Sequence, residues 1–159
     1  MNPYFHEFDV IRYVYNVLAS GDVFVDVGAM GGLYTIIASK RVGPHGKVLA
    51  IEPNSEVYRV LKEHVELNNL ENVVLENCAV GEDYRPVSLR FDEGYEELAS
   101  IDESRGDVKM VPLDALVSNF EFIKVLKVDT EGYDEKVIIS SGDSLQKTCV
   151  VVSEMNTET

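Results

Sequence analysis

The chain has 159 residues, 45% of them hydrophobic, which is enough for one domain with a substantial core. Its 28 acidic and 14 basic residues give a formal net charge of −14, which disfavours non-specific binding to nucleic acid or to anionic membranes. No apolar run is long enough to span a bilayer and no signal-peptide pattern opens the chain, so we expect a cytoplasmic protein.

The N-terminal segment 1–20 is expected to contain an amphipathic helix over residues 5–18. Its apolar residues recur at helical spacing and would form the face that packs on the core: Phe5, Phe8, Ile11, Tyr15 and Leu18.

The rest of the chain is organised around the stretch that follows. The β-branched and aromatic run 23–27 predicts a buried parallel strand, with Asp26 just before its end. Gly28, Gly31 and Gly32 then allow a tight turn, and a helix is expected at 33–41. A strand, a glycine turn and a helix start form the usual nucleotide-binding corner of an α/β sheet, although such a turn can also be a simple connection.

The spacing of this turn distinguishes two kinds of nucleotide site. Asp26 stands two residues before Gly28, and D-x-G-x-x-x-G is typical of class I S-adenosylmethionine-dependent methyltransferases rather than of the dinucleotide pattern G-x-G-x-x-G. A carboxylate here suits a ligand with a cationic amino-acid end, whereas it would repel a pyrophosphate.

Strands and helices continue to alternate along the chain. We expect further strands at 47–52, 73–80, 122–129 and 149–153, an added pair at 86–91 and 108–112, and helices at 54–67, 113–117 and 134–141, the last closed by Gly142. The helix at 54–67 would bury Val57, Leu61, Val65 and Leu67 and leave His64 in solvent. The acidic segment 92–107 lacks periodicity and predicts a long loop.

This alternation predicts a single domain, 1–159, with its core at 23–154. The expected fold is a Rossmann-like, doubly wound α/β fold with a mostly parallel sheet and helices on both faces. Four strands end in or near Asp26, Glu52, Asp129 and Glu154. Because parallel strands share right-handed crossovers, these ends lie on one edge and predict one ligand site.

Glu52 follows Gly28 by 24 residues, at the end of the second strand. A carboxylate at that point can accept both hydroxyls of a ribose, and the simpler role of an acid at a helix N-terminus is compatible with this. Cys78 and Cys149 lie far apart in apolar runs, so we expect two buried thiols and neither a disulfide nor a metal pair. The acids offer no third ligand at convincing spacing, and no metal site is predicted.

Taken together, these strands, turns and acidic residues make the chain resemble the FkbM-type methyltransferases, a branch of the class I S-adenosylmethionine-dependent fold. The resemblance spans roughly residues 23–154 and rests on the order of six segments: 26–35, 51–54, 67–69, 77–81, 113–116 and 126–134.

The resemblance implies a role for each matching residue. The methionine part of S-adenosylmethionine would be held by Asp26, Gly28, Ala29, Met30, Gly31 and Gly32, with Tyr34 beside them. The ribose would be held by Glu52, with Pro53 and Asn54 lining that side, and the adenine would lie near Cys78, Ala79 and Val80. Asp129, Glu131 and Gly132 would adjoin the transferred methyl group.

The expected reaction is methylation of a hydroxyl on a sugar or another small metabolite, and the hydroxyl preference rests on the resemblance alone. Asp129 and Glu131 are the candidates for the general base, with Glu154 behind them, and Asp129 could equally be a carboxylate that only orients the cofactor. Two other functions stay open: an NAD-type oxidoreductase, and a binding or scaffold module without turnover.

The sequence ends just past the fifth main strand. The class I fold usually continues into a terminal hairpin, so either this sequence is part of a longer chain or the protein lacks that hairpin. In the second case the apolar strand 149–153 would lie at an open sheet edge, and we expect self-association through it.

Overall fold

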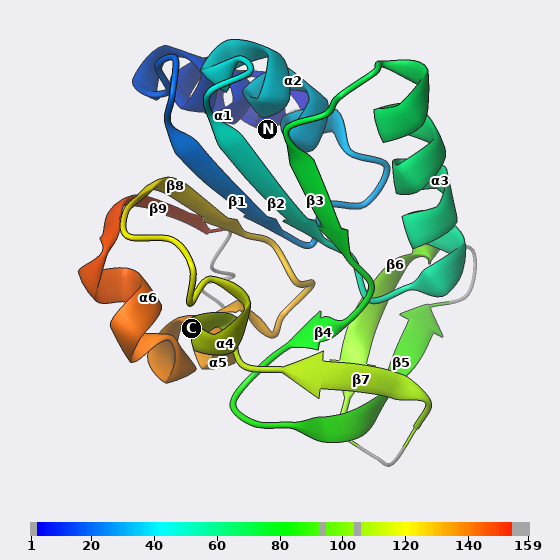
Figure 1. The fold of residues 1–159 in the computed structure, drawn as a ribbon. Coiled ribbons are helices and arrows are strands. Elements are labelled where there is room, and N and C mark those ends of the chain that lie inside the picture. Colours follow the sequence, from blue (N-terminus) through cyan, green and yellow to red (C-terminus); the bar gives the residue numbers. More distant parts are fainter. Residues whose placement is uncertain (1–2, 93–94, 104–105, 154–159) are drawn as a thin grey trace.

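The computed structural model describes residues 3–92, 95–103 and 106–153. Its centre is a five-stranded sheet in the order β3-β2-β1-β8-β9 (Figure 1). The strands are β1 (Val23–Val27), β2 (Lys47–Ile51), β3 (Val73–Glu76), β8 (Ile123–Val128) and β9 (Thr148–Ser153). Every pairing in this sheet is parallel, so the predicted α/β fold is confirmed.

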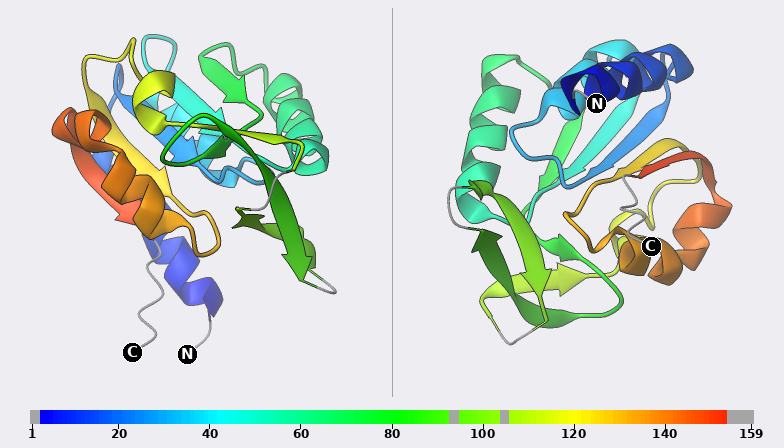
Figure 2. Two further views of the ribbon diagram at one scale, coloured as in Figure 1. Left: turned by 90° about the horizontal axis from the view of Figure 1, so that it is seen from below. Right: turned by 180° about the vertical axis from the view of Figure 1, so that it is seen from behind.

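Helices cover both faces of the sheet (Figures 1 and 2). One face carries α1 (Pro3–Val17), α2 (Leu33–Val42) and α3 (Ser55–Leu67), and the other carries α4 (Leu113–Leu116), α5 (Asp134–Ser140) and α6 (Gly142–Gln146). Alternate residues of each strand face opposite helices, because strand side chains have a period of two. Val48 therefore packs with α1 and α2, whereas its neighbour Leu49 packs with the α4–α6 side.

A second sheet lies beside the carboxyl ends of the central strands, in the order β4-β7-β5-β6 (Figure 2). Its strands are β4 (Ala79–Val80), β5 (Arg85–Asp92), β6 (Tyr95–Asp102) and β7 (Val108–Val111). The expected pair 86–91 and 108–112 is confirmed as the antiparallel β5–β7 ladder. The prediction of a loop over 92–107 is wrong, because β6 occupies much of that segment and pairs with β5.

The expected strand 73–80 is also interrupted. It divides into β3 and β4, which belong to different sheets. Between them the side chain of Asn77 turns back and donates a hydrogen bond to the carbonyl oxygen of Glu52 at 2.8 Å. This bond joins the residue after β3 to the residue after β2, and the next residue, Cys78, lies in the core with 3% of its surface exposed.

Three other expectations about packing are wrong. Phe8 is 70% exposed, and α1 packs on the core through Val10, Val14 and Val17, a face offset from the predicted one. Leu67 is 78% exposed at the end of α3, and Cys149 is exposed on β9. The helix expected at 134–141 ends as α5 at Ser140, with Ser141 as its C-cap, and Gly142 begins α6.

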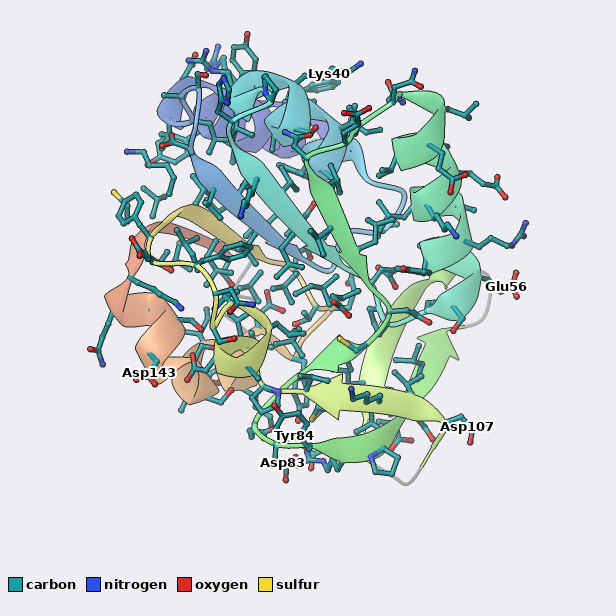
Figure 3. The ribbon with its side chains drawn as sticks, viewed as in Figure 1. Lys40, Glu56, Asp83, Tyr84, Asp107 and Asp143 are labelled. Carbon is teal, nitrogen blue, oxygen red and sulfur yellow. The ribbon has the colours of Figure 1, made fainter. Side chains whose placement is uncertain are left out.

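The remaining element boundaries agree with the predictions to within a few residues. Asn54 caps α3 by accepting a hydrogen bond from the amide of Glu56 at 3.0 Å. Exposed carboxylates such as Glu56, Asp83 and Asp143 lie on the periphery of the molecule, as Figure 3 shows, and this is where much of the negative charge lies. Over the described residues, no helix is long and apolar enough to cross a membrane.

Candidate active site

The glycine turn after β1 brings two distant strand ends together. Gly28 has a φ of 79°, and the amides of Gly28 and Ala29 both donate to the carbonyl of Ile51 at 3.0 Å. A Cβ atom on Gly28 would lie 1.8 Å from the carbonyl oxygen of Asp129. Glycine is therefore required here, because any side chain would force the ends of β1 and β8 apart.

Glu52 is held rigidly at the end of β2. Its Oε2 accepts a hydrogen bond from the amide of Met30 at 3.0 Å, and its Oε1 accepts one from the amide of Asn54 at 2.8 Å. Burial raises the pKa of this carboxyl, and the two amide bonds oppose that shift. Each oxygen keeps a second lone pair, so the carboxylate can accept two further hydrogen bonds from a ligand.

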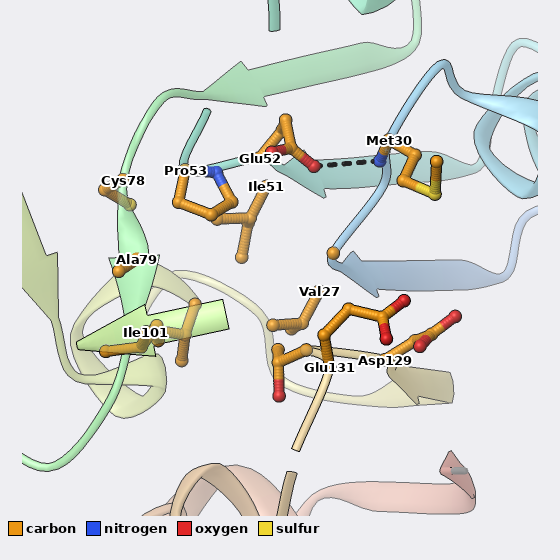
Figure 4. Close-up of a pocket in the computed structure, with 13 residues that line it drawn as sticks. Val27, Met30, Ile51, Glu52, Pro53, Cys78, Ala79, Ile101, Asp129 and Glu131 are labelled. Carbon is orange, nitrogen blue, oxygen red and sulfur yellow. Dashed lines mark hydrogen bonds between the residues drawn. The ribbon is translucent and has the colours of Figure 1, made fainter. Parts of the chain in front are cut away.

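These elements line a pocket at the carboxyl edge of the sheet (Figure 4). Its lining consists of Val27, Gly28, Met30, Ile51, Glu52, Pro53, Cys78, Ala79, Val80, Ile101, Asp129, Thr130 and Glu131. Carboxylates stand at two sides of the pocket and apolar side chains form the wall between them, as expected for a ligand with polar and apolar parts.

Asp129 and Glu131 lie side by side at one end of the pocket, as Figure 4 shows. Glu131 has a φ of 51°, in the left-handed region, and Gly132 follows with a φ of 96°. The chain is anchored just before this bend, because the amide and hydroxyl of Thr130 both donate to Asp134 Oδ2, at 3.1 and 2.8 Å. Strained backbone of this kind concentrates at functional sites.

Lys127 forms ion pairs with the carboxylates of Asp26 and Asp129. It is 5% exposed, and its Nζ lies 3.4 Å from Asp26 Oδ1, 3.2 Å from Asp129 Oδ2 and 3.4 Å from the carbonyl oxygen of Gly28. The two carboxylates raise the pKa of Lys127 although its burial acts in the opposite direction. The ammonium thus links the ends of β1 and β8.

Asp26 is fully buried behind the glycine turn and does not line the pocket. Its Oδ2 accepts a hydrogen bond from the hydroxyl of Thr35 at 2.7 Å, and its Oδ1 has only the ion pair with Lys127. Burial raises the pKa of Asp26, and Lys127 opposes the shift. In this arrangement Asp26 supports the turn and the lysine from behind.

The predicted site residues fall into two groups. Those that line the pocket are Gly28, Met30, Glu52, Pro53, Ala79, Val80, Asp129 and Glu131, whereas Asp26, Ala29, Gly31, Gly32, Tyr34 and Asn54 stand behind or beside it. Among the second group, the Tyr34 ring lies 4.9 Å from Lys127 Nζ. Glu154 lies outside the described residues.

Sequence reasoning missed three contributors. Ile101 of β6 lines the pocket but comes from a segment expected to be a loop. His64, expected in solvent, places its Nδ1 2.7 Å from the carbonyl oxygen of Gly31 and so supports the glycine turn from α3. Lys127 could have been identified from the sequence, because it is a charged residue inside the apolar run 122–128. Within the described part of the chain, no group of three or more potential ligands could hold a metal ion.

Comparison with known proteins gives a consistent result. A sequence model of the FkbM methyltransferase domain matches residues 26–158. Methyltransferase 1 of Beauveria bassiana is 24% identical over 140 residues, which cover 72% of this chain and 56% of that protein.

Solved structures share the fold. A methyltransferase FkbM from Methylobacillus flagellatus superposes with a TM-score of 0.59 at 14% identity, covering 84% of this chain and 33% of the other. A SAM-dependent methyltransferase from Aquifex aeolicus has a TM-score of 0.54 at 16% identity, covering 93% and 66%. The chain therefore spans less than two thirds of the length of each of these relatives.

Proposed function

Because the chain belongs to the FkbM methyltransferase family, we propose that it binds S-adenosylmethionine in this pocket and transfers the methyl group to a hydroxyl of a sugar or another small metabolite. The observation that carries the proposal is the carboxylate of Glu52, fixed by two backbone amides at the end of β2 and directed at the pocket. The choice of a hydroxyl acceptor follows the family resemblance.

The residues present fit this cofactor. Glu52 offers two oriented oxygens for the two ribose hydroxyls, and Pro53 lies next to it. The wall formed by Cys78, Ala79 and Val80 is apolar and suits the adenine ring. Gly28 and Met30 bring main chain to the opposite side, where the amino-acid part of the cofactor would lie.

When bound, the cofactor supplies an electrophilic methyl group and a thioether leaving group. The work left to the protein is to hold donor and acceptor in line at close range and to receive the proton of the acceptor hydroxyl. Asp129 and Glu131 line the pocket and are our candidates to receive that proton.

We assign the two acids different roles. Asp129 Oδ2 is 3.2 Å from the Lys127 ammonium, which fixes the carboxylate and suits an orienting role. Glu131 projects from the bend at the pocket end and is our preferred general base.

Calorimetric titration tests the proposal directly. We expect saturable binding of S-adenosylmethionine and none of NAD⁺, and a Glu52→Gln variant should bind the cofactor at least tenfold more weakly. Binding of NAD⁺ alone would favour an oxidoreductase. Cofactor binding with no methyl transfer to any of a broad panel of hydroxyl compounds would favour a binding module without turnover.

We also propose that two copies of the chain associate through β9. In the described part of the structure this strand stands at the edge of the central sheet, and Val151 is 41% exposed on it. Its Cys-Val-Val-Val run contains no charge or proline to discourage pairing.

A further inference from the structure

The lining of the pocket comes from two separate parts of the fold. Val80 belongs to β4 and Ile101 to β6, both in the second sheet. Thr130 and Glu131 belong to the bend that follows β8 of the central sheet. The shape of the pocket therefore depends on how the bend is held against the second sheet.

Packing leaves this bend without support at its tightest point. Gly132 has a φ of 96°, and a Cβ atom placed on it would meet none of the described heavy atoms within 4 Å beyond its chain neighbours. Thr130 is anchored to Asp134, but Asp134 is the first residue of α5. That contact ties the bend to the helix that follows it and leaves the distance to the second sheet open.

The hydroxyl of Tyr133 connects the bend to the second sheet. It donates a hydrogen bond to Glu82 Oε2 at 2.7 Å and accepts one from Arg85 Nη2 at 3.2 Å. Glu82 lies between β4 and β5, and Arg85 is the first residue of β5. Tyr133 is 6% exposed, and its burial raises the pKa of its hydroxyl to about 12, with the bond to Glu82 acting in the same direction. The hydroxyl therefore stays protonated and remains a donor.

Charged groups extend this connection to the end of β6. Glu103, which follows β6, pairs with Arg85 at 3.7 Å and also with Lys136 of α5. The Lys136 Nζ lies 4.8 Å from the centre of the Tyr133 ring. The side chains of Glu103 and Lys136 are each about half exposed, so their ion pair contributes little by itself. The buried hydroxyl of Tyr133 is the member whose loss should matter most.

These contacts also lie close to the pocket along the chain. Glu82, Glu103 and Tyr133 each come two residues after a residue of the lining. Side chains behind a binding site commonly fix its geometry through hydrogen bonds of this kind, and small displacements of the lining weaken binding.

We propose that Tyr133 is a positioning residue for the pocket: through Glu82 and Arg85, its hydroxyl holds the bend after β8 at the distance from the second sheet that S-adenosylmethionine requires. Tyr133 acts through these partners, since it is not itself among the lining residues. This inference rests on the proposed function, because it takes the pocket as the cofactor site.

The test measures the affinity for S-adenosylmethionine by calorimetry in the native chain and in four single variants. Tyr133→Phe removes the hydroxyl and keeps the ring. Glu82→Ala removes the acceptor, whereas Glu82→Gln keeps an oxygen that can still accept the bond. The matched control is Tyr84→Phe, which removes the hydroxyl of a 66% exposed tyrosine in the same turn as Glu82. Circular dichroism under the titration conditions establishes that each variant is folded, so a loss of stability alone does not change the measured affinity.

We expect Tyr133→Phe and Glu82→Ala each to weaken binding by about threefold or more. Their double variant should bind no more weakly than the weaker single variant, because both changes remove the same bond. Glu82→Gln and Tyr84→Phe should stay within about twofold of the native affinity.

Native affinity in Tyr133→Phe, or additive losses in the double variant, would overturn the inference. If Tyr133→Phe does not fold, the two Glu82 variants decide, and equal affinities of Glu82→Ala and Glu82→Gln would overturn it. A native chain that does not bind S-adenosylmethionine would instead refute the proposed function on which the inference rests.

Discussion

Replacing Lys127 with methionine removes the charge that holds the two carboxylates while keeping most of the side-chain volume. Asp26 then keeps the Thr35 hydroxyl as a partner but loses its buried counter-ion, which lies 3.4 Å away in the native protein. Removing one member of a buried ion pair typically costs about 3–5 kcal/mol of the free energy of unfolding.

Asp26 can limit this loss by folding in its protonated form. Protonating a carboxyl of ordinary pKa costs about 4 kcal/mol at pH 7 and about 1.5 kcal/mol at pH 5, at 1.36 kcal/mol per pH unit. We therefore expect Lys127→Met to lose about 3–4 kcal/mol at pH 7 and about 1–2 kcal/mol at pH 5.

The stability of Lys127→Met should fall as the pH rises, because Asp26 takes up a proton on folding. Burial already raises the pKa of Asp26 in the native protein, and removal of the lysine raises it further. A carboxyl whose pKa is higher in the folded state than in the unfolded state binds a proton on folding. Its contribution to stability is therefore present at low pH and is lost as the pH rises through the folded pKa.

Urea unfolding followed by circular dichroism at pH 5, 6 and 7 measures the effect. Lys124→Met is the matched control on the same strand, since its ammonium lies 4.0 Å from the Cys149 thiol, and we expect it to stay within about 0.5 kcal/mol of native. The double variant Asp26→Asn, Lys127→Met should lose the added pH dependence. A loss in Lys127→Met that is equal at all three pH values would refute the reasoning.

Three further predictions follow from single features. Glu52→Gln should weaken cofactor binding at least tenfold in calorimetry, whereas Glu56→Gln, at an exposed position, should leave it unchanged. Equal effects of the two substitutions would show that Glu52 does not bind the cofactor. Gly28→Ala should lower the free energy of unfolding by about 3 kcal/mol or more, because the strain of a positive φ adds to the overlap of the new Cβ with the carbonyl oxygen of Asp129. Gly132→Ala, which has a positive φ but open space around it, should cost about 1 kcal/mol. Val151→Lys should reduce the sedimentation coefficient of the native chain at high concentration, and a native chain that sediments as a monomer would refute pairing through β9.

The central sheet could be predicted because its signals are local. Each main strand is a compact apolar run, and the glycine turn and Glu52 stand at fixed offsets from strand ends. Once the strands are parallel, their ends must meet at one edge, so the pairing of Asp129 with the glycine turn follows from topology.

The second sheet could not be predicted in the same way. β6 is stabilised by pairing with β5, and the segment that contains it shows neither alternation nor an apolar run. Ile101 was missed for that reason. The packing face of α1 was misjudged because Phe8 and Tyr15 give a competing apolar stripe, and both are exposed in the structure.

The bond from Lys127 to the carbonyl of Gly28 joins residues 99 positions apart, and this separation has a consequence for how the pocket comes into being. Contacts between such distant segments form late, because closing a long loop must precede any gain from the contact. A ligand that contacts both strand ends needs this contact, so it binds the folded domain rather than the unfolded chain. Such a ligand at 100 times its Kd would stabilise the whole domain by about 2.7 kcal/mol, and its presence would show as a rise in melting temperature.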